Sequence, residues 1–284
     1  MIFSFHDRTY DLDRHPLIAG ILNVTPDSFS DGGNFLNPEK ACEQGLKLLA
    51  KGADFLDIGG ESTRPGSLSI ETEEELRRVI PVIRALRKKT NTPLSIDTSK
   101  AAVAREAIAA GADIINDVTA LQGDLLMGDL VANAGVGLIL MHMQGIPLTM
   151  QQAPSYPNND IVTAVTEFLF QAKERALGYG VVSNSIIIDP GLGFGKTLQH
   201  NLTLLRNLPY LAKLGSPIMI GHSRKSFLAS IAPSTSQETT INNRLAPALA
   251  ITTLTYSLGA RLFRVHEPEP HKQALEISKL MTLH

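Results

Sequence analysis

LIAGILNVTPDSFSDGG, residues 17–33, holds both the start of the fold and the first sign of chemistry. The run 17–22 is apolar and lacks the alternation of a half-exposed strand, which is typical of a parallel strand buried on both faces. The residues after it offer an amide, hydroxyls, two carboxylates and a glycine pair. An ordinary turn needs far less, because Gly, Pro and one Asx or Ser suffice. The stretch therefore predicts a buried strand that leads into a ligand-binding loop.

The same order, a short apolar run followed by an amphipathic stretch, repeats along the whole chain. The runs expected to form buried strands are 17–22, 54–58, 93–97, 113–116, 136–141, 185–189, 216–220 and 261–265. The expected helices are 38–51, 72–88, 99–110, 124–133, 160–179, 198–207, 242–258 and 268–281. Eight strand–helix units predict an α/β protein with a (β/α)8 TIM barrel, in which residues 1–284 form a single domain. An open doubly wound sheet is the alternative, but the nucleotide fingerprint that usually follows its first strand is absent here.

Local signals predict where several elements begin and end. Asn37-Pro38-Glu39, Thr72-Glu73-Glu74 and Asp97-Thr98-Ser99 are expected to start helices. A Gly-Ala pair, found at 52–53, 111–112 and 259–260, is expected to end a helix and lead into a core strand. Residues 1–13 alternate polar and apolar side chains and are expected to form a short strand or hairpin at the barrel bottom.

Composition narrows the class of protein. The chain has 284 residues, 43% hydrophobic content and a net charge of −2, which is typical of an ordinary globular protein. The lack of basic excess argues against nucleic acid and anionic membranes as partners, and no apolar run reaches the length of a membrane span. The N-terminus lacks the pattern of a signal peptide, so a cytoplasmic location is expected. The single cysteine, Cys42, excludes an internal disulfide and is expected to be a buried thiol.

Polar residues follow every expected strand. In a TIM barrel the reactive groups lie at the carboxyl ends of the strands. The groups that this rule brings to one rim are Asn23, Gly59–Gly66, Asp97, Asn116–Asp117, Met141–Gln144, Asp189–Lys196, Gly221–Ser226 and Arg264–His266. Most of them need a partner that the barrel itself does not supply, which predicts a ligand.

The chemistry of the rim divides into two sides. Arg64, Arg264 and His266, with Asn23, form a cationic and amide-rich side suited to a polyphosphate. On the other side, carboxylates, an amide and an amine lie among apolar groups, which suits a flat heterocycle with several N–H donors. The residues of that slot are Asp97, Asn116, Asp189, Lys225, Met141, Phe194 and Gly221. Asp97 and Asp189 could instead cap the helices that follow them, and the sequence leaves both uses open.

The spacing of potential ligands gives no zinc site. His266 and His271 are one residue too far apart for a zinc-protease pair, and Pro268 and Pro270 break the helix that such a pair requires. Magnesium remains compatible with the sequence, because Mg²⁺ needs only one or two protein oxygens beside a phosphorylated substrate.

Together these motifs resemble the dihydropteroate synthase family. The matching segments are GILNVTPDSFSDGG (20–33), DIGGESTRPG (57–66), SIDTSK (95–100), INDV (115–118), MHMQG (141–145), DPGLGFGK (189–196), SRKSF (223–227) and RVH (264–266). The resemblance implies a (β/α)8 barrel that joins p-aminobenzoate to 6-hydroxymethyl-7,8-dihydropterin diphosphate with Mg²⁺, giving 7,8-dihydropteroate and pyrophosphate. It also implies a homodimer, a place in folate biosynthesis and a role as the sulfonamide target.

The resemblance assigns a role to each site residue. The pterin would contact Asp97, Asn116, Asp189 and Lys225, with Met141 and Gly221 lining its slot. The diphosphate would contact Asn23, Arg264 and His266, with Asn23 also near Mg²⁺. The p-aminobenzoate site would include Phe29, Thr63, Arg64, Pro65, Phe194 and Ser223, and Asp31 belongs to the same substrate-binding loops. The family mechanism is dissociative, so Asp97, Lys225, Arg264 and His266 would act by charge stabilisation and orientation.

Three positions depart from the family pattern: His222, Glu267 and the helix start at 243–250. None is an expected ligand, so the departures concern helix packing and oligomer contacts. Two other functions remain as alternatives. A methyltetrahydrofolate-binding methyltransferase domain shares the barrel and the pterin slot, but would not need the loop 62–66 or the arylamine pocket. A non-catalytic pterin-binding paralogue would be expected to lack Asp31, Thr63, Arg64, Arg264 and His266, all of which are present.

Overall fold

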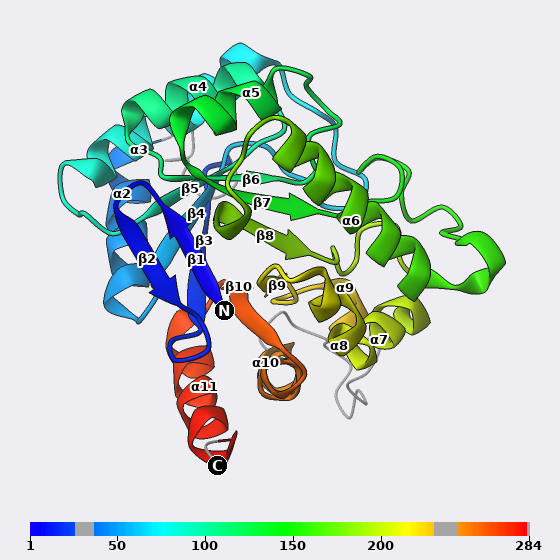
Figure 1. Cartoon of the computed structure of the whole chain (residues 1–284). Helices are drawn as coiled ribbons and strands as arrows, with labels where there is room; N and C mark the ends of the chain where they lie inside the picture. Colours follow the sequence, from blue (N-terminus) through cyan, green and yellow to red (C-terminus); the bar gives the residue numbers. More distant parts are fainter. Residues whose placement is uncertain (26–36, 230–243, 283–284) are drawn as a thin grey trace.

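The computed structural model describes residues 1–25, 37–229 and 244–282. Within these residues, eight parallel strands close into a barrel in the order β10-β3-β4-β5-β6-β7-β8-β9, which confirms the predicted TIM barrel (Figure 1). The strands are β3 (Leu17–Asn23), β4 (Phe55–Gly59), β5 (Leu94–Asp97), β6 (Ile114–Asp117), β7 (Gly137–Met141), β8 (Ile186–Asp189), β9 (Ile218–Ile220) and β10 (Ala260–Val265). Their interior and exterior side chains are buried, as expected for strands with a core on both faces.

Helices surround the barrel on the outside (Figure 1). They are α2 (Pro38–Ala50), α3 (Thr72–Arg87), α4 (Ala101–Ala110), α5 (Met127–Ala134), α6 (Ile161–Gly178), α7 (Leu198–Arg206), α10 (Leu245–Ser257) and α11 (Pro268–Thr282). Shorter helical segments that were not predicted are η1 (Pro157–Asn159), η2 (Ser183–Ser185), α8 (Leu208–Leu211), η3 (Ala212–Leu214) and α9 (Ser226–Ala229). Each spans about one turn, which is too short to show a helical period in the sequence. No helix in the described ranges is long and apolar enough to cross a membrane.

The predicted starts of α2 and α3 are confirmed, although the cap of α3 differs, whereas the predicted start of α4 is two residues too early. The Asn37 side chain accepts hydrogen bonds from the first turn of α2, as predicted. The N-cap of α3 is Glu71 rather than Thr72, and it makes no side-chain cap bond. Helix α4 begins after Lys100, because Asp97 is engaged inside the barrel instead of capping the helix.

A hairpin closes the barrel at the amino ends of its strands. β1 (Ile2–Phe5) pairs antiparallel with β2 (Arg8–Asp11), as predicted for the first residues. Phe3, Phe5 and Leu12 are buried in one cluster with the first inward side chains of the strands. A β-carbon on Gly137 would stand 2.8 Å from Cζ of Phe3, so only glycine leaves room for this ring at the start of β7.

The junctions between helices and strands use a repeated device. Gly52, Gly111 and Gly259 have φ angles of 93°, 112° and 105°, which confirms them as left-handed helix ends. The aspartate that follows two of them binds the preceding strand: Asp54 Oδ2 accepts from Ile18 N at 2.8 Å, and Asp113 Oδ2 accepts from Leu94 N at 2.9 Å.

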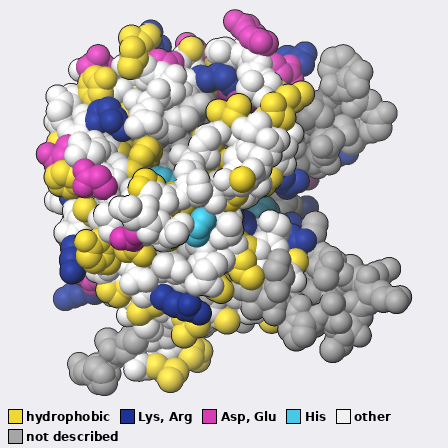
Figure 2. Space-filling view, turned by 90° about the vertical axis from the view of Figure 1, so that its right-hand side faces the viewer, with side chains coloured by type: hydrophobic (Ala, Val, Ile, Leu, Met, Phe, Trp, Pro, Cys, Tyr) yellow, Lys and Arg dark blue, Asp and Glu magenta, His cyan; other side chains and the backbone are white. Residues whose placement is uncertain are grey.

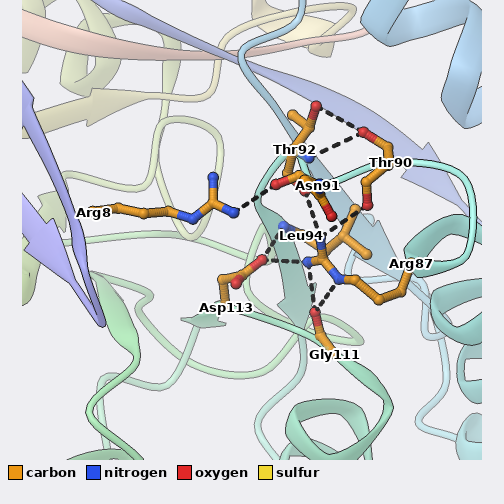
Figure 3. A network of polar contacts seen from close by, with 8 residues as sticks. All are labelled: Arg8, Arg87, Thr90, Asn91, Thr92, Leu94, Gly111 and Asp113. Atoms are coloured by element: carbon orange, nitrogen blue, oxygen red, sulfur yellow. Dashed lines mark hydrogen bonds and ion pairs between the residues drawn. The ribbon is translucent and has the colours of Figure 1, made fainter.

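Arg87, the last residue of α3, stabilises the junction at Gly111. Figure 3 shows its guanidinium surrounded by acceptors. Arg87 Nε donates to Gly111 O at 3.1 Å, and Nη1 donates to the carbonyls of Thr90 and Thr92 at the same distance. An ion pair with Asp113 completes the set. This end of the barrel is therefore held by polar contacts, while the opposite end carries the candidate chemistry.

Candidate active site

The polar residues predicted at the strand ends lie together at one end of the barrel. Strand register places Asn23 beside Gly59, Gly59 beside Asp97, and Asp97 beside Asn116. Strands β7 and β8 point to the right-hand side of Figure 1, and Figure 2 looks onto that side, where Lys and Arg side chains gather next to a histidine. The barrel thus presents amide, carboxylate and cationic groups on one face, as predicted.

A buried aspartate just below this level was not among the predicted site residues. Asp57 is 1% exposed and accepts hydrogen bonds from Ser95 Oγ at 2.7 Å and from Asn116 Nδ2 at 3.1 Å. It also forms an ion pair with Arg264. Because a carboxylate only accepts, the amide nitrogen of Asn116 must face Asp57. Sequence reasoning missed Asp57 because it lies inside an apolar run that resembles an ordinary core strand, although it opens the motif DIGGESTRPG.

Arg264 bridges two carboxylates from neighbouring strands. Its Nε atom pairs with Asp57, and Nη2 donates to Asp97 Oδ2 at 2.7 Å. Burial disfavours the charge, but Asp57 and Asp97 outweigh it and raise the pKa of Arg264, so the side chain is cationic. The guanidinium lies between the two predicted sides of the rim. Its contact with a diphosphate remains a prediction.

Buried oxygen acceptors line the predicted slot. Asn116 Oδ1 is buried and has no donor among the described residues. Asp189 is 3% exposed; its Oδ1 accepts from a backbone N–H at 2.7 Å, and Oδ2 lies 3.6 Å from where a β-carbon on Gly221 would stand. Burial raises the pKa of Asp97 to about 7, although the neighbouring guanidinium opposes this shift. Acceptors that lack donors suit a ligand edge with several N–H groups.

Gly221 leaves space in front of these acceptors, and Met141 lies beside them. A β-carbon on Gly221 would also stand 3.9 Å from Cβ of Arg264, so glycine keeps open the region between Asp189 and Arg264. Met141 is 4% exposed and pairs in register with Asp189. Both positions agree with the predicted lining of a slot.

Lys225 and Phe194 lie together at another side of the slot. The ammonium nitrogen of Lys225 donates to Leu192 O and lies 4.3 Å from the centre of the Phe194 ring, within cation–π distance. A β-carbon on Gly193 would stand 3.2 Å from Cδ of Lys225, so the loop passes directly against the lysine. Burial lowers the pKa of Lys225 to about 7, while Asp189 opposes this shift. The amine is therefore a donor placed near the acceptor side of the slot.

The cations of the anion side differ from those predicted. The backbone N–H of His266 donates to Ser223 Oγ at 3.3 Å, and its Nδ1 lies 3.1 Å from the same hydroxyl. Burial, followed by Arg224, Arg264 and Arg64, lowers the pKa of His266 to about 3. The imidazole is neutral at pH 7, so it offers an N–H rather than a charge. The positive charge comes from the three arginines, of which Arg224 was not predicted as a site residue.

Two departures from the family pattern acquire a structural role. Glu267 forms an ion pair with Arg224 at 3.6 Å beside the anion side. His222 is fully buried: its Nε2 lies 3.0 Å from Thr252 Oγ1, which in turn lies 2.8 Å from His271 Nδ1. This chain of contacts joins the end of β9 to α10 and α11. His222 therefore fixes helix packing directly behind the slot, as the sequence suggested.

The predicted p-aminobenzoate residues are only partly placed. Phe29 and Asp31 lie outside the described residues. Thr63 is half-buried, and Arg64 and Pro65 are exposed on the loop after β4. Arg64 lies near enough to His266 to affect its pKa, so the loop approaches the anion side. The assignment of this loop to an arylamine remains a prediction.

The described residues contain no cluster of three or more His, Cys, Asp or Glu that could hold a metal ion. Asn23, half-buried at the rim, offers an amide oxygen 4.0 Å from where a β-carbon on Gly59 would stand. One amide oxygen beside an anion site fits Mg²⁺, which takes its remaining ligands from phosphate and water.

Comparison with known proteins identifies the family. The family described as Pterin binding enzyme matches residues 19–266. The dihydropteroate synthase of Synechocystis sp. is 40% identical over 277 residues, which cover 98% of this chain and 91% of the relative. The Yersinia pestis dihydropteroate synthase, solved with a sulfonamide drug, is 39% identical with a TM-score of 0.89 over 99% of each chain.

A further solved relative links the fold to ligands. The dihydropteroate synthase of Xanthomonas albilineans, solved with 4-aminobenzoic acid, is 43% identical with a TM-score of 0.89 and covers 100% of this chain and 99% of its own. The same enzyme has been solved with 7,8-dihydropteroate. The family match, the identity over almost the full length and the shared barrel lead to one conclusion: the chain belongs to the pterin binding enzymes and, among them, to the dihydropteroate synthase family.

Proposed function

We propose that the chain joins p-aminobenzoate to 6-hydroxymethyl-7,8-dihydropterin diphosphate, giving 7,8-dihydropteroate and pyrophosphate in folate biosynthesis. The observation that carries this proposal is the slot itself, in which Asn116 Oδ1 is buried without a donor beside the buried carboxylates of Asp189 and Asp97. The relatives named for this activity, and the complexes of one of them with 4-aminobenzoic acid and 7,8-dihydropteroate, support it over the methyltransferase and paralogue alternatives.

The slot residues suit the pterin ring. Its amino group and ring N–H groups would donate to Asp189 and Asn116, while the ammonium of Lys225 would donate to a ring carbonyl or ring nitrogen. Asp97 would lie near the methylene carbon that becomes electron-poor, with Arg264 holding the carboxylate in place. Each donor that reaches a charged acceptor contributes about 1.5–3 kcal/mol, which is enough to select a pterin over a ring without these N–H groups.

The reaction needs charge stabilisation rather than a nucleophile from the protein. The bond between the pterin methylene carbon and the diphosphate oxygen breaks, and pyrophosphate leaves with the electron pair. The arylamine nitrogen then bonds to the methylene carbon and loses a proton. Asn23, Arg264 and neutral His266 would donate to the developing negative charge of pyrophosphate, and the slot would orient the ring for attack.

We propose Mg²⁺ as the cofactor, with the Asn23 amide oxygen as its ligand from the described residues. Bound Mg²⁺ would neutralise part of the charge on the diphosphate. The support is the neutral oxygen of Asn23 at a rim where Arg224 and Arg264 supply the other positive charge. A cytoplasmic location remains a prediction.

We also propose a homodimer. Four apolar side chains on the adjacent helices α10 and α11 are strongly exposed: Leu254 by 65%, Ile277 by 59%, Leu280 by 68% and Met281 by 78%. Ile277, Leu280 and Met281 share one face of α11, because residues three and four apart are neighbours on a helix. An apolar patch of this kind supports contact with a second copy. Ile277→Glu with Leu280→Glu should shift the mass measured by light scattering from dimer to monomer, and an unchanged mass would place the interface elsewhere.

One assay tests the proposed activity. Pyrophosphate release and dihydropteroate formation are measured with the pterin diphosphate, with and without p-aminobenzoate. We expect dihydropteroate and stoichiometric pyrophosphate only when both substrates and Mg²⁺ are present. Pyrophosphate release that ignores p-aminobenzoate, or no release at all, would contradict the proposal.

A further inference from the structure

A buried ion cluster ties together the two loops that follow β4 and β5. The ammonium of Lys100 lies 2.5 Å from Glu75 Oε2 and also pairs with Glu61. Glu75, in the first turn of α3, has a side chain only 1% exposed, whereas those of Lys100 and Glu61 are 23% and 20% exposed. We call these three residues the Lys100 bridge. It lies beside the slot but contains none of the residues assigned to either substrate.

The bridge fixes the first residues of the loop 61–71. Arg78 Nη1 donates to Gly60 O at 2.8 Å, and a β-carbon on Gly60 would stand 2.7 Å from Cγ1 of Val79, so the backbone at Gly60 is pressed against α3. Directly after it, Glu61 is drawn to Lys100. The backbone of one residue and the side chain of the next are thus both held at the root of the loop.

Beyond this root the loop has few anchors of its own. None of residues 61–71, all of which the structure describes, is buried. Ser67 closes a local turn by donating to Ser62 O at 2.5 Å, and Gly66 N donates to Pro147 O at 2.9 Å on a neighbouring loop. A segment without apolar anchors takes its position from its ends. The orientation of the arylamine residues Thr63–Pro65 therefore depends on Glu61.

The Lys100 bridge depends on the positive charge of Lys100. Two carboxylates pair with one ammonium group. Glu75 is too buried for water to screen its charge, so its carboxylate depends on Lys100. Although burial of the amine works against it, the bonds to Glu61 and Glu75 raise the pKa of Lys100, so it is charged at neutral pH. Removing the cation would leave two carboxylates facing each other, and Glu61 would swing toward water.

We propose that Lys100 is a positioning residue for the second substrate: through Glu61 it holds the loop 61–71 in the shape that presents Thr63, Arg64 and Pro65 to p-aminobenzoate. This inference rests on the proposed function. It predicts that the bridge affects the arylamine and leaves the pterin slot intact.

Glu61→Ala is the sharpest test, because it cuts the loop from the bridge and leaves the buried pair Lys100–Glu75 in place. Glu71→Ala is the matched control, since Glu71 is an exposed glutamate at the other end of the same loop and makes no side-chain cap bond. We expect Glu61→Ala to raise KM for p-aminobenzoate about tenfold, which corresponds to about 1.4 kcal/mol. The calorimetric Kd for the free pterin should stay within twofold of the parent. Glu71→Ala should change neither.

Substitutions of Lys100 and amide hydrogen exchange distinguish a failure of this inference from a failure of the proposed function. Lys100→Arg keeps the charge and should retain most of the arylamine affinity, whereas Lys100→Met should follow Glu61→Ala. Amide hydrogen exchange over residues 62–68 should be faster in Glu61→Ala than in Glu71→Ala, with or without substrates. Equal exchange and equal KM in the two variants, or an equal loss of pterin affinity, would overturn the inference. If the parent protein shows no turnover, the proposed function fails, and hydrogen exchange alone still decides whether Glu61 tethers the loop.

Discussion

At the scale of single residues, the slot depends as much on an absent side chain as on the groups that bind. Gly221 keeps open the space in front of Asp189 and Arg264, and its φ angle is not in the left-handed region. Gly221→Ala should therefore leave the free energy of unfolding within about 1 kcal/mol of the parent. The added methyl group should weaken pterin binding at least tenfold. Gly178→Ala, where a β-carbon meets nothing within 4 Å, is the control. Unchanged pterin affinity in Gly221→Ala would mean that the ring does not occupy this space.

Asp189→Asn tests the acceptor side of the slot. The carboxylate is expected to accept two N–H donors from the ring, and an amide would present one donor against them, leaving a buried donor facing a donor. We expect binding of the free pterin to be lost while thermal unfolding stays cooperative. Calorimetry with the pterin alone measures this, and affinity within a few-fold of the parent would sink the assignment.

Residues also mark the limit of prediction from the sequence. Asp189, Asn116 and Lys225 were predicted because each stands where an apolar run ends. Asp57 and Lys100 were not, since their partners lie more than 20 positions away along the chain. The sequence does not show which groups surround a polar side chain inside a strand, such as Asp57, so its role could not be predicted. The neutral state of His266 likewise follows from burial, which no motif reveals.

At the scale of elements, strand and helix positions could be predicted closely because each strand is a short apolar run that is buried on both sides. The short helical segments could not, and neither could the cap of α3, which is Glu71 without a side-chain cap bond. The Gly-Ala junctions were predicted to end helices, and they do so with glycines in the left-handed region. What the sequence did not reveal is that Arg87 occupies the space beside Gly111.

The contact between Arg87 and Gly111 allows backbone strain and steric clash to be measured separately at a helix end. Gly111→Ala forces a left-handed φ on alanine and places its β-carbon 2.9 Å from Cγ of Arg87. Gly180→Ala, with φ of 93° and nothing within 4 Å, carries the backbone cost alone. We expect Gly180→Ala to lower the free energy of unfolding by about 1–2 kcal/mol, and Gly111→Ala to lower it by more. Urea denaturation measures both. Equal losses of unfolding free energy in the two variants would show that the Arg87 side chain moves aside without a measurable cost.

At the scale of the whole molecule, buried neutral histidines link stability to pH. Burial lowers the pKa of His222 to about 3 and that of His271 to about 4, below the value near 6.5 of an unfolded chain. The unfolded state therefore binds more protons in acid, so the contribution of these residues is fully present above pH 6.5 and is lost as the pH falls toward 4.

The free energy of unfolding should accordingly fall by roughly 2 kcal/mol for each such histidine between pH 6.5 and 5. Denaturation by urea across this range measures the slope. His271→Asn should make the slope shallower even if the protein is less stable overall, whereas His6→Gln, at an exposed position, should leave it unchanged. Equal slopes in the parent and His271→Asn would show that His271 is not held neutral.

Because Phe3, Phe5 and Leu12 of the β1–β2 hairpin fill the barrel interior at the amino ends of the strands, the described residues leave the slot accessible only from the carboxyl ends. Under the proposed function, the pterin is expected to bind first, since an arylamine bound at the mouth would block its path. The product, with its pterin end innermost, would then leave past the loop 61–71 before another pterin binds. A molecule that binds at the mouth of the barrel would then block both the entry of substrates and the release of product.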